Sequence, residues 1–200
     1  MKIKKIELYN FRNYNNLILD LKDGLNVIVG GNAQGKTNLI EAIYFCALGK
    51  SFRTSKEKEV IAWGKEISKI KLTIEKEIGT KTIEIIFSKS QKKTVKIDGL
   101  PIKKIGELMG ELKCVFFAPD ELKLIKDSPE DRRKFMDIHI SQTSKQYFYN
   151  LGKYNKLIDS RNKTLKDNVT FDEKAKLLSI YDRQLAKLNL EISAARKFFV

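Results

Sequence analysis

The sequence predicts an α/β fold in which a mixed β-sheet carries an added layer of antiparallel strands and is followed by a helical subdomain. A glycine-rich loop at residues 30–37 lies between a short apolar run and a segment with helical periodicity. Two strand-like runs follow at 68–78 and 81–90, and long segments with helical periodicity fill the rest of the chain. We therefore expect two domains, 1–124 with the sheet and 125–200 with the helices.

The N-terminal residues have the pattern of paired strands. Residues 2–9 alternate between apolar and polar side chains, and residues 15–21 supply a partner of similar character. Asp23 and Gly24 form a turn signal between this partner and the next segment. The apolar run at 25–29 is typical of a short buried strand, which would lead directly into the glycine-rich loop.

The loop fits the pattern G-x-x-x-x-G-K-[ST]. Glycine lets successive backbone N–H groups turn inward around a phosphate, and the loop opens onto the positive end of a helix. We expect Lys36 to contact the β- and γ-phosphates of ATP as the catalytic residue, and the Thr37 hydroxyl to bind the Mg²⁺ that bridges them. The predicted phosphate-binding residues are Gly30, Gly31, Asn32, Ala33, Gln34, Gly35, Lys36 and Thr37. The sequence therefore predicts a P-loop NTPase.

An antiparallel meander follows the P-loop segment. The runs at 68–78 and 81–90 flank a glycine turn, and residues 93–99 add a third strand. Because adjacent strands joined by tight turns run antiparallel, this part of the chain excludes a wholly parallel sheet.

Two further elements close the first domain. Residues 102–109 predict a short helix, and the dense apolar run at 112–119 predicts a buried strand that ends at Pro119. Asp120 and Glu121 follow this strand, where a P-loop ATPase would carry its Walker B acid. Pro119 counts against that role, because it removes an amide donor and distorts the end of the strand.

Helix-start signals mark the second domain. Ser128 is a candidate N-cap with Pro129 at the first helical position, and a further helical segment begins near Thr143. Thr170 and Glu173 form a capping box ahead of another helix. The apolar stripe of that helix consists of Leu177, Leu178, Tyr181, Leu185, Leu188 and Ile192.

Composition and charge narrow the class of partner. The formal net charge of +14 and the pI of about 9.6 favour a polyanion such as nucleic acid as the partner, although scattered lysines also serve simply to keep a surface soluble.

The chain has no apolar run of about 18 residues, so we expect a cytoplasmic protein without a membrane segment. Cys46 and Cys114 lack metal-ligand spacing and fit reduced, buried thiols, and His139 has no second ligand nearby.

Basic and aromatic side chains leave several interpretations open. The lysines at 89–93 could contact a phosphate backbone, but a charged turn is more often solvated. Arg132 and Arg133 could contact DNA or pair with acidic residues of the same helix. The aromatic residues at 147–154 could stack on bases, yet their helical spacing favours packing within the helical domain.

Five segments carry a resemblance to a known family. They are NFRNY (10–14), GGNAQGKTNLIEAIYF (30–45), KSFRTSKEKEVIAWG (50–64), VFFAPDELKLIKDSPEDRRKFMD (115–137) and YNKLIDSRN (154–162). In this order they resemble the N-terminal part of the RecF family, ABC-type ATPases of recombinational DNA repair that are related to SMC and Rad50 heads. The resemblance implies an ABC-type head with a helical second lobe.

The resemblance also implies a function and further site residues. RecF-like proteins form an ATP-dependent homodimer, bind double-stranded or gapped DNA, and act with RecR, and indirectly RecO, to load recombinase. It places Arg12, Asn13 and Asn38 at the bound nucleotide. It places Arg53 near the nucleotide and DNA, and gives Asp120 a coupling role at the junction of the two lobes.

One departure from the family pattern limits the expected activity. ABC ATPases carry a serine-glycine signature motif, a Walker B acidic pair and a switch histidine, and this sequence contains no recognisable copy of them. The resemblance places these motifs in a C-terminal stretch. We therefore expect an N-terminal fragment that binds nucleotide weakly and hydrolyses it little when alone.

Two functions from other classes remain open. One is a small P-loop kinase, in which Arg132 and Arg133 would act as a lid and Asp120 as the acid. The other is an interaction scaffold that binds a partner through its helices and performs no chemistry of its own.

Overall fold

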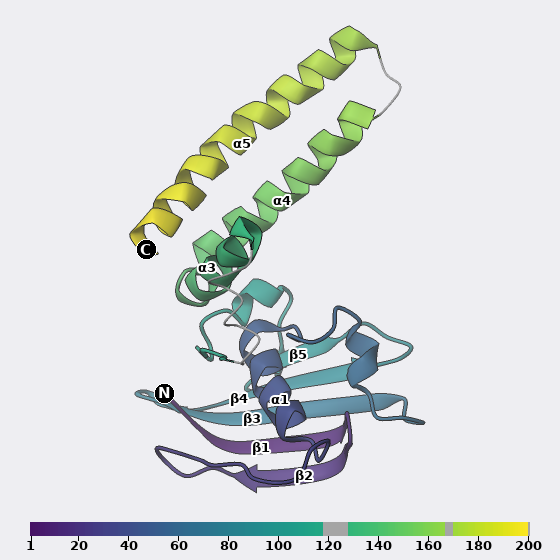
Figure 1. The fold of residues 1–200 in the computed structure, drawn as a ribbon, viewed down its shortest axis with the longest axis vertical. Helices are drawn as coiled ribbons and strands as arrows, with labels where there is room; N and C mark the ends of the chain where they lie inside the picture. Colours follow the sequence, from purple (N-terminus) through teal and green to yellow (C-terminus); the bar gives the residue numbers. More distant parts are fainter. Residues whose placement is uncertain (118–127, 167–169, 200) are drawn as a thin grey trace. The chain divides into compact units, whose positions relative to one another are not determined.

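A computed structural model describes residues 1–117, 128–166 and 170–199. The chain divides into two compact units, Met1–Phe116 and Phe117–Val200 (Figure 1). The domain boundary predicted at residue 124 falls between the described ranges and stays a prediction. In the described ranges, no helix combines the length and apolar character that a membrane span requires.

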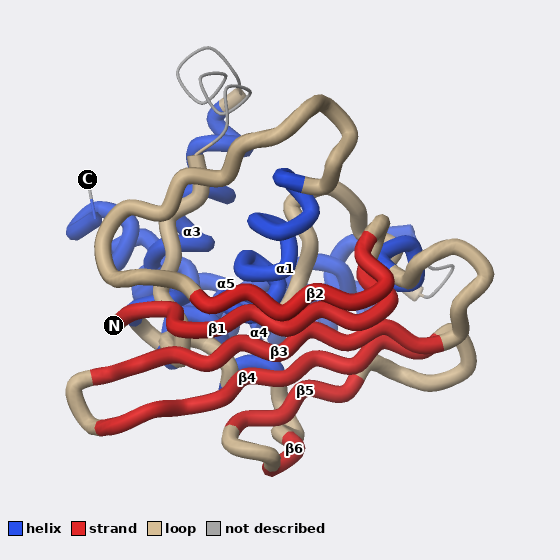
Figure 2. Tube along the Cα trace, turned by 90° about the horizontal axis from the view of Figure 1, so that it is seen from below, coloured by secondary structure: helices blue, strands red, loops and turns tan. Residues whose placement is uncertain are grey.

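The first unit is built on one six-stranded sheet in the order β2-β1-β3-β4-β5-β6 (Figure 2). All strand pairs described in it are antiparallel. Its strands are β1 (Lys2–Phe11), β2 (Tyr14–Asp20), β3 (Ile67–Lys76), β4 (Gly79–Ser88), β5 (Thr94–Ile97) and β6 (Leu100–Pro101). The N-terminal strand pair and the meander predicted from alternating side chains are therefore confirmed.

Alternation along the strands creates the core of this unit. In β3 the side chains of Ile70, Leu72 and Ile74 are fully buried, while the intervening side chains remain partly exposed. Helix α1 (Lys36–Leu48) lies against the sheet (Figure 1). Its Phe45 ring packs edge-on against Phe87 of β4, with ring centroids 5.0 Å apart. Burial of this apolar surface anchors α1, and with it the glycine-rich loop that precedes it.

A glycine ends α1. Gly49 has a φ of 70° and donates its N–H to the Phe45 carbonyl at 2.7 Å. A Cβ at this position would lie 2.5 Å from Cδ1 of Ile105, so only glycine fits without displacement of the neighbour. Two 3₁₀ helices follow, η1 (Glu57–Val60) and η2 (Ile105–Glu107). The second is the short helix predicted at 102–109, reduced to a single turn.

Two predicted buried strands are wrong. Residues 25–29 form no strand, and their side chains are exposed, with Leu25 at 89% and Val29 at 84%. The run at 112–119 forms no strand over its described residues 112–117, where Val115 and Phe117 are exposed. A strand requires a neighbour to receive its N–H and C=O groups, and within the described ranges neither segment has one. Apolar character alone did not specify strand pairing here.

The two cysteines differ in burial. Cys46 in α1 is fully buried, and this burial raises the pKa of its thiol. Cys114 is half-buried rather than buried as predicted, and burial raises its pKa to about 11. Both thiols therefore stay protonated at neutral pH, as expected for unreactive cysteines.

The second unit is helical. It contains α3 (Pro129–Thr143), α4 (Lys145–Lys166) and α5 (Phe171–Phe199), with α4 and α5 side by side (Figure 1). The Ser128 hydroxyl accepts the Asp131 N–H at the start of α3, which confirms the predicted cap. Ahead of α5, the Thr170 hydroxyl accepts the Glu173 backbone N–H at 3.4 Å, which is one half of the predicted capping box, and it also donates to the Glu173 carboxylate at 2.8 Å.

An apolar cluster joins the three helices. Ile140, Tyr147, Leu188 and Ile192 form its buried centre. The predicted stripe on α5 is therefore confirmed toward its C-terminal end, whereas Leu177 is 41% exposed. Tyr147 and Tyr154 pack in or against this cluster, which supports the packing interpretation of the aromatic residues.

A polar contact reinforces this cluster. The Asp137 carboxylate of α3 accepts two hydrogen bonds from Arg196 of α5, both at 2.8 Å, and a short one from the Tyr147 hydroxyl of α4. Burial and the neighbouring carboxylate raise the pKa of Tyr147 to about 12, so this hydroxyl stays protonated and donates. One carboxylate thus links all three helices.

Removal of this carboxylate should destabilise the helical unit. Asp137→Ala leaves a partly buried guanidinium and a hydroxyl without their partner, and we expect a loss of about 2–3 kcal/mol. Asp182→Ala is the matched control, because it breaks a more exposed pair with Arg161 and should have a much smaller effect on the free energy of unfolding. Urea unfolding followed by circular dichroism measures both, and equal losses would contradict the prediction.

A second carboxylate should make the sheet unit sensitive to acid. Burial raises the pKa of Glu111, but the ammonium groups of Lys76 and Lys81, at 2.7 and 3.0 Å, lower it more, so its pKa is held below the usual range of a glutamate. A carboxylate with a lowered folded-state pKa adds stability above its unfolded pKa and loses it as the pH falls through the folded value. Glu111→Gln should therefore destabilise the protein at pH 7 and have less effect at pH 3.

The exposed Glu77 provides the comparison for this acid effect. Glu77→Gln should change the free energy of unfolding equally little at both pH values. Denaturant titrations of the two variants and the wild type at pH 7 and pH 3 give the measurement. A Glu111→Gln effect that does not depend on pH would show that its ion pairs contribute nothing.

Candidate phosphate-binding site

The glycine-rich loop has the backbone shape of an anion site. Ala33 has a φ of 63° and Gly35 a φ of 101°, and α1 begins at Lys36 directly after them. When residues in the left-handed backbone conformation alternate with residues in the right-handed one, successive N–H groups point toward one side of the chain. The N-terminus of the helix contributes further partial positive charge at the same place. The loop is exposed from Gly30 to Gln34, so an anion can reach it from solvent.

The two side chains of the motif lie at the first turn of α1. The Lys36 ammonium donates to the carbonyl oxygens of Gly30 and Gly31, at 2.6 and 2.7 Å, and therefore lies over the loop. Thr37 is exposed one residue later. Its hydroxyl is a hard oxygen donor of the kind Mg²⁺ takes together with phosphate oxygens and water, so the residue fits the predicted metal role.

The turn between β1 and β2 packs against the loop. This turn contains Arg12 and Asn13, and its backbone is held by the Arg12 N–H, which donates to the Val60 carbonyl at 2.7 Å. A Cβ built on Gly35 would lie 2.7 Å from Oδ1 of Asn13 and 2.9 Å from the Tyr14 hydroxyl. The second glycine of the motif is thus required both by its backbone angle and by this close approach.

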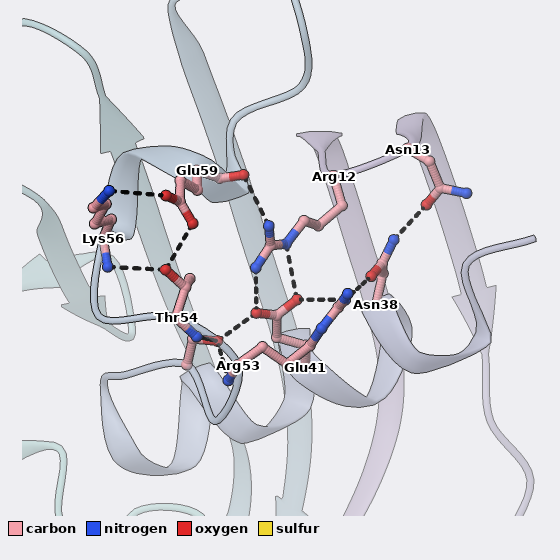
Figure 3. A network of polar contacts seen from close by, with 9 residues as sticks. Arg12, Asn13, Asn38, Glu41, Arg53, Thr54, Lys56 and Glu59 are labelled. Carbon is pink, nitrogen blue, oxygen red and sulfur yellow. Dashed lines mark hydrogen bonds and ion pairs between the residues drawn. The ribbon is translucent and has the colours of Figure 1, made fainter. Parts of the chain in front are cut away.

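Glu41 on the second turn of α1 is a fully buried carboxylate (Figure 3). Arg12 binds it through two hydrogen bonds, from Nε at 2.9 Å and from Nη2 at 2.7 Å. The Ser51 hydroxyl donates a short hydrogen bond to the same carboxylate, and Nη1 of Arg53 lies 3.6 Å from its second oxygen. Three segments distant in the sequence therefore meet at one acidic group.

Asn38 extends this network toward the loop. Its side-chain oxygen accepts from Nη1 of Arg53 at 2.6 Å, and its amide donates to Oδ1 of Asn13 at 2.8 Å (Figure 3). Asn38 directly follows Thr37, so the network reaches the motif itself. The structure brings together Arg12, Asn13, Asn38 and Arg53, the residues outside the loop that the family resemblance placed at or near the nucleotide.

Sequence reasoning missed Glu41 and Ser51. The available signal was an acidic residue in an otherwise apolar helical segment, NLIEAIYF, where burial of the helix would force the carboxylate to find a cation. Asp120, the other predicted coupling residue, lies outside the described residues, so its role stays a prediction.

Two of the remaining basic candidates, Lys89 and Lys93, have specific partners. Lys93 was expected in a solvated turn, but its side chain is only 16% exposed and forms a short ion pair with Glu57. It also donates to the Gly49 carbonyl at 2.6 Å, which ties the end of α1 to η1. Lys89 lies 3.3 Å from Glu66. In the helical unit, Asp137 pairs with Arg196 of another helix rather than with an arginine of its own helix.

Comparison with known proteins places this geometry in context. The model of a family described as "AAA domain" matches residues 5–197. The DNA replication and repair protein RecF of Clostridium tetani is 44% identical over all 200 residues, which cover 54% of that protein. The solved recombination mediator protein RecF-ATPrS of the RecFOR pathway is 35% identical, with a TM-score of 0.91 over 98% of this chain and 53% of its own.

A more distant likeness concerns the fold alone. A solved structure of SMC ATPases is 22% identical, with a TM-score of 0.57 over 69% of this chain. The chain thus spans about half the length of the curated relatives it matches.

The contact between Gly35 and the turn gives a test by substitution. Gly35→Ala should destabilise the protein by about 1–2 kcal/mol, because alanine is strained in the left-handed backbone conformation of this position. It should cost about 1 kcal/mol more because the new Cβ would displace the Asn13 and Tyr14 side chains. Gly64→Ala is the matched control, because its φ of 73° carries a similar strain but its Cβ would meet nothing within 4 Å. Chemical denaturation compares the two, and equal losses would contradict the close approach.

Proposed function

Because this chain belongs to the AAA domain family and is similar over its whole length to RecF, we propose that it binds ATP at Gly30–Thr37 within a DNA-repair ATPase. The observation that carries this proposal is the loop itself, with its left-handed residues at the start of α1 and the Lys36 ammonium above it. An arrangement of inward amides, a helix N-terminus and one cation is suited to a polyphosphate.

The sequence-based identification of the fold is confirmed. The chain has the P-loop head fold of RecF and SMC proteins, an α/β unit with an antiparallel sheet and helices. The name of the recombination mediator structure RecF-ATPrS, which has a TM-score of 0.91 with this chain, includes a nucleotide. This likeness supports ATP as the anion at the loop.

The residues of the loop would act mainly by binding and orientation. Backbone N–H groups of Gly31 to Gly35 would hold phosphate oxygens, and Lys36 would release its two carbonyl contacts to meet the β- and γ-phosphates. Thr37 would contribute its hydroxyl to Mg²⁺, which neutralises phosphate charge when bound. Asn13 and Asn38 would keep the loop against the β1–β2 turn.

Hydrolysis would depend on more than this loop. An ATPase needs an acidic group that orients the attacking water and supports the metal. We propose that this group, and the signature motif that covers the nucleotide in an ABC-type homodimer, belong to the part of the relatives that this chain does not span. On this proposal the 200 residues bind ATP weakly and turn it over slowly.

DNA is the partner that charge favours. The net charge of +14 is suited to a polyanion, and a groove of the sheet unit is lined by Lys56, Lys58, Lys92 and Lys93. Two of these are paired with Glu59 and Glu57, so Lys58 and Lys92 are the residues we propose for phosphate contact.

Because the name of a similar solved structure includes the RecFOR pathway, we also propose RecR, and indirectly RecO, as partners at gapped DNA in the cytoplasm.

Substitution of Lys36 tests the nucleotide site. Lys36→Ala should weaken MgATP binding at least about 30-fold, because a charged contact to phosphate contributes about 2–3 kcal/mol. Titration calorimetry of this chain measures the affinity. The exposed Lys65 of the same unit provides the control, and Lys65→Ala should leave the affinity within about two-fold of wild type.

The same pair of variants tests the link to DNA. Fluorescence anisotropy with a labelled gapped duplex measures DNA binding with and without MgATP. In a full-length RecF-type protein, MgATP should increase the affinity for DNA, and Lys36→Ala should remove this increase. ATP binding that survives Lys36→Ala would sink the assignment of the loop. ATP binding without any effect on DNA would sink only the repair function.

A further inference from the structure

Trp63 is the only tryptophan of the sequence, and it is fully exposed. Its full exposure leaves a large aromatic face in contact with water, where that face gains nothing from packing. Single exposed apolar side chains are common on proteins and by themselves need no function. The backbone that holds this residue and the charges beside it, however, are specific enough to indicate a ligand.

A well-defined turn presents the indole ring. The Ala62 N–H donates to the Asn10 carbonyl at 2.8 Å, and the Lys65 N–H donates to the Ala62 carbonyl at 3.0 Å, so the turn closes around Trp63 and Gly64. Gly64 has a φ of 73°, a left-handed conformation that glycine adopts readily in tight turns. The ring is therefore carried by a backbone that is fixed on the end of β1.

This turn borders the groove whose lysines we propose for phosphate contact. One wall of the groove contains residues 55–59, which lead through η1 to the turn, and the other contains residues 87–88 and 90–93. At the second wall the Lys89 N–H donates to the Glu66 carbonyl at 3.1 Å, and Ile67 pairs with Ser88. Each wall is thus joined to one end of the turn, the first by the chain and the second by hydrogen bonds.

The charges around the groove favour an anion. Three acidic side chains at the groove or the turn are each paired with a lysine, namely Glu57 with Lys93, Glu59 with Lys56 and Glu66 with Lys89. Lys58 and Lys92 line the same groove, and the exposed Lys65 belongs to the turn itself. A cationic groove beside an aromatic face is the combination that holds single-stranded nucleic acid, because lysines follow the phosphates and the ring stacks on a base.

The aromatic face restricts which form of DNA fits. Inside a duplex, neighbouring base pairs cover both faces of each base, so an indole ring can stack only on a base that has left the stack. The lysines make no such distinction, since phosphates are accessible in both forms. A preference for unpaired DNA at this groove would therefore come from Trp63.

From these observations we propose that Trp63 stacks on an unpaired DNA base while Lys58 and Lys92 contact the adjoining phosphates. The inference rests on the proposed DNA partner. It adds a residue that contacts a base, and it assigns a single-stranded segment to this groove.

The single tryptophan makes a direct test possible. A short oligothymidylate is titrated into the 200-residue chain at low ionic strength and without ATP, and the intrinsic fluorescence of Trp63 is recorded. Stacking on thymine should quench this fluorescence as the strand binds. A long duplex, held through its phosphates alone, should leave the fluorescence nearly unchanged. Binding of the oligothymidylate without quenching overturns the proposal.

A cycle between residue and base separates stacking from mere proximity. Fluorescence anisotropy gives the affinity of the wild type and of Trp63→Ala for the labelled oligothymidylate and for an abasic strand of the same length and charge. Trp63→Ala should weaken binding of the oligothymidylate about 10-fold and leave binding of the abasic strand within about two-fold of wild type. Trp63→Phe keeps an aromatic face and should recover most of the affinity. Equal losses on both strands overturn the proposal.

Ile78→Ala is the matched control. Ile78 is also almost fully exposed, and it lies in the same unit beyond the opposite end of β3, so its loss should leave both affinities within about two-fold of wild type. Because Trp63 is fully exposed, its variants lose no buried contact and should fold as the wild type does.

The outcomes distinguish this inference from the function on which it rests. If the wild type binds neither the oligothymidylate nor the duplex, the proposed DNA partner and this inference fail together. If it binds both and Trp63→Ala changes neither affinity, this inference alone fails, and the exposed ring then fits a protein partner better than DNA.

Discussion

The buried ion pair between Glu41 and Arg12 is the constraint on which the rest of the site depends. Helix α1 is anchored on the sheet by apolar packing, and that packing carries the Glu41 carboxylate out of water. Arg12 can reach it only if the β1–β2 turn lies across the helix. The same turn places Asn13 against Gly35, so charge balance in the interior determines the surroundings of the glycine-rich loop.

The glycine-rich loop and the network around Glu41 have opposite electrostatic character. Around Glu41, cations surround a buried negative charge, and the contacts are short and shielded from solvent. At residues 30–37 the amides, the helix end and Lys36 are all positive and are open to solvent. Asn38 and Arg53 lie between these two regions, where Nη1 of Arg53 donates to the Asn38 side chain and lies 3.6 Å from Glu41.

The helical unit has its own version of a shared carboxylate. Asp137 joins three helices through Arg196 and Tyr147, next to an apolar cluster that supplies most of the contact. In both units a single acidic side chain links several elements, because it accepts hydrogen bonds from each of them. A chain with such an excess of lysine and arginine can supply cations to each buried acid and still carry a strongly positive surface.

Local patterns in the sequence determined much of this protein. The meander at β3–β5, the cap at Ser128 and the P-loop motif each depend on residues close together in the chain, so periodicity and turn chemistry sufficed to predict them. Only the tertiary structure decided that residues 25–29 stay exposed and that Glu41 joins Arg12 and Arg53. Strand pairing and the neutralisation of a buried charge both need partners from distant segments, and no local pattern specifies which segments will meet.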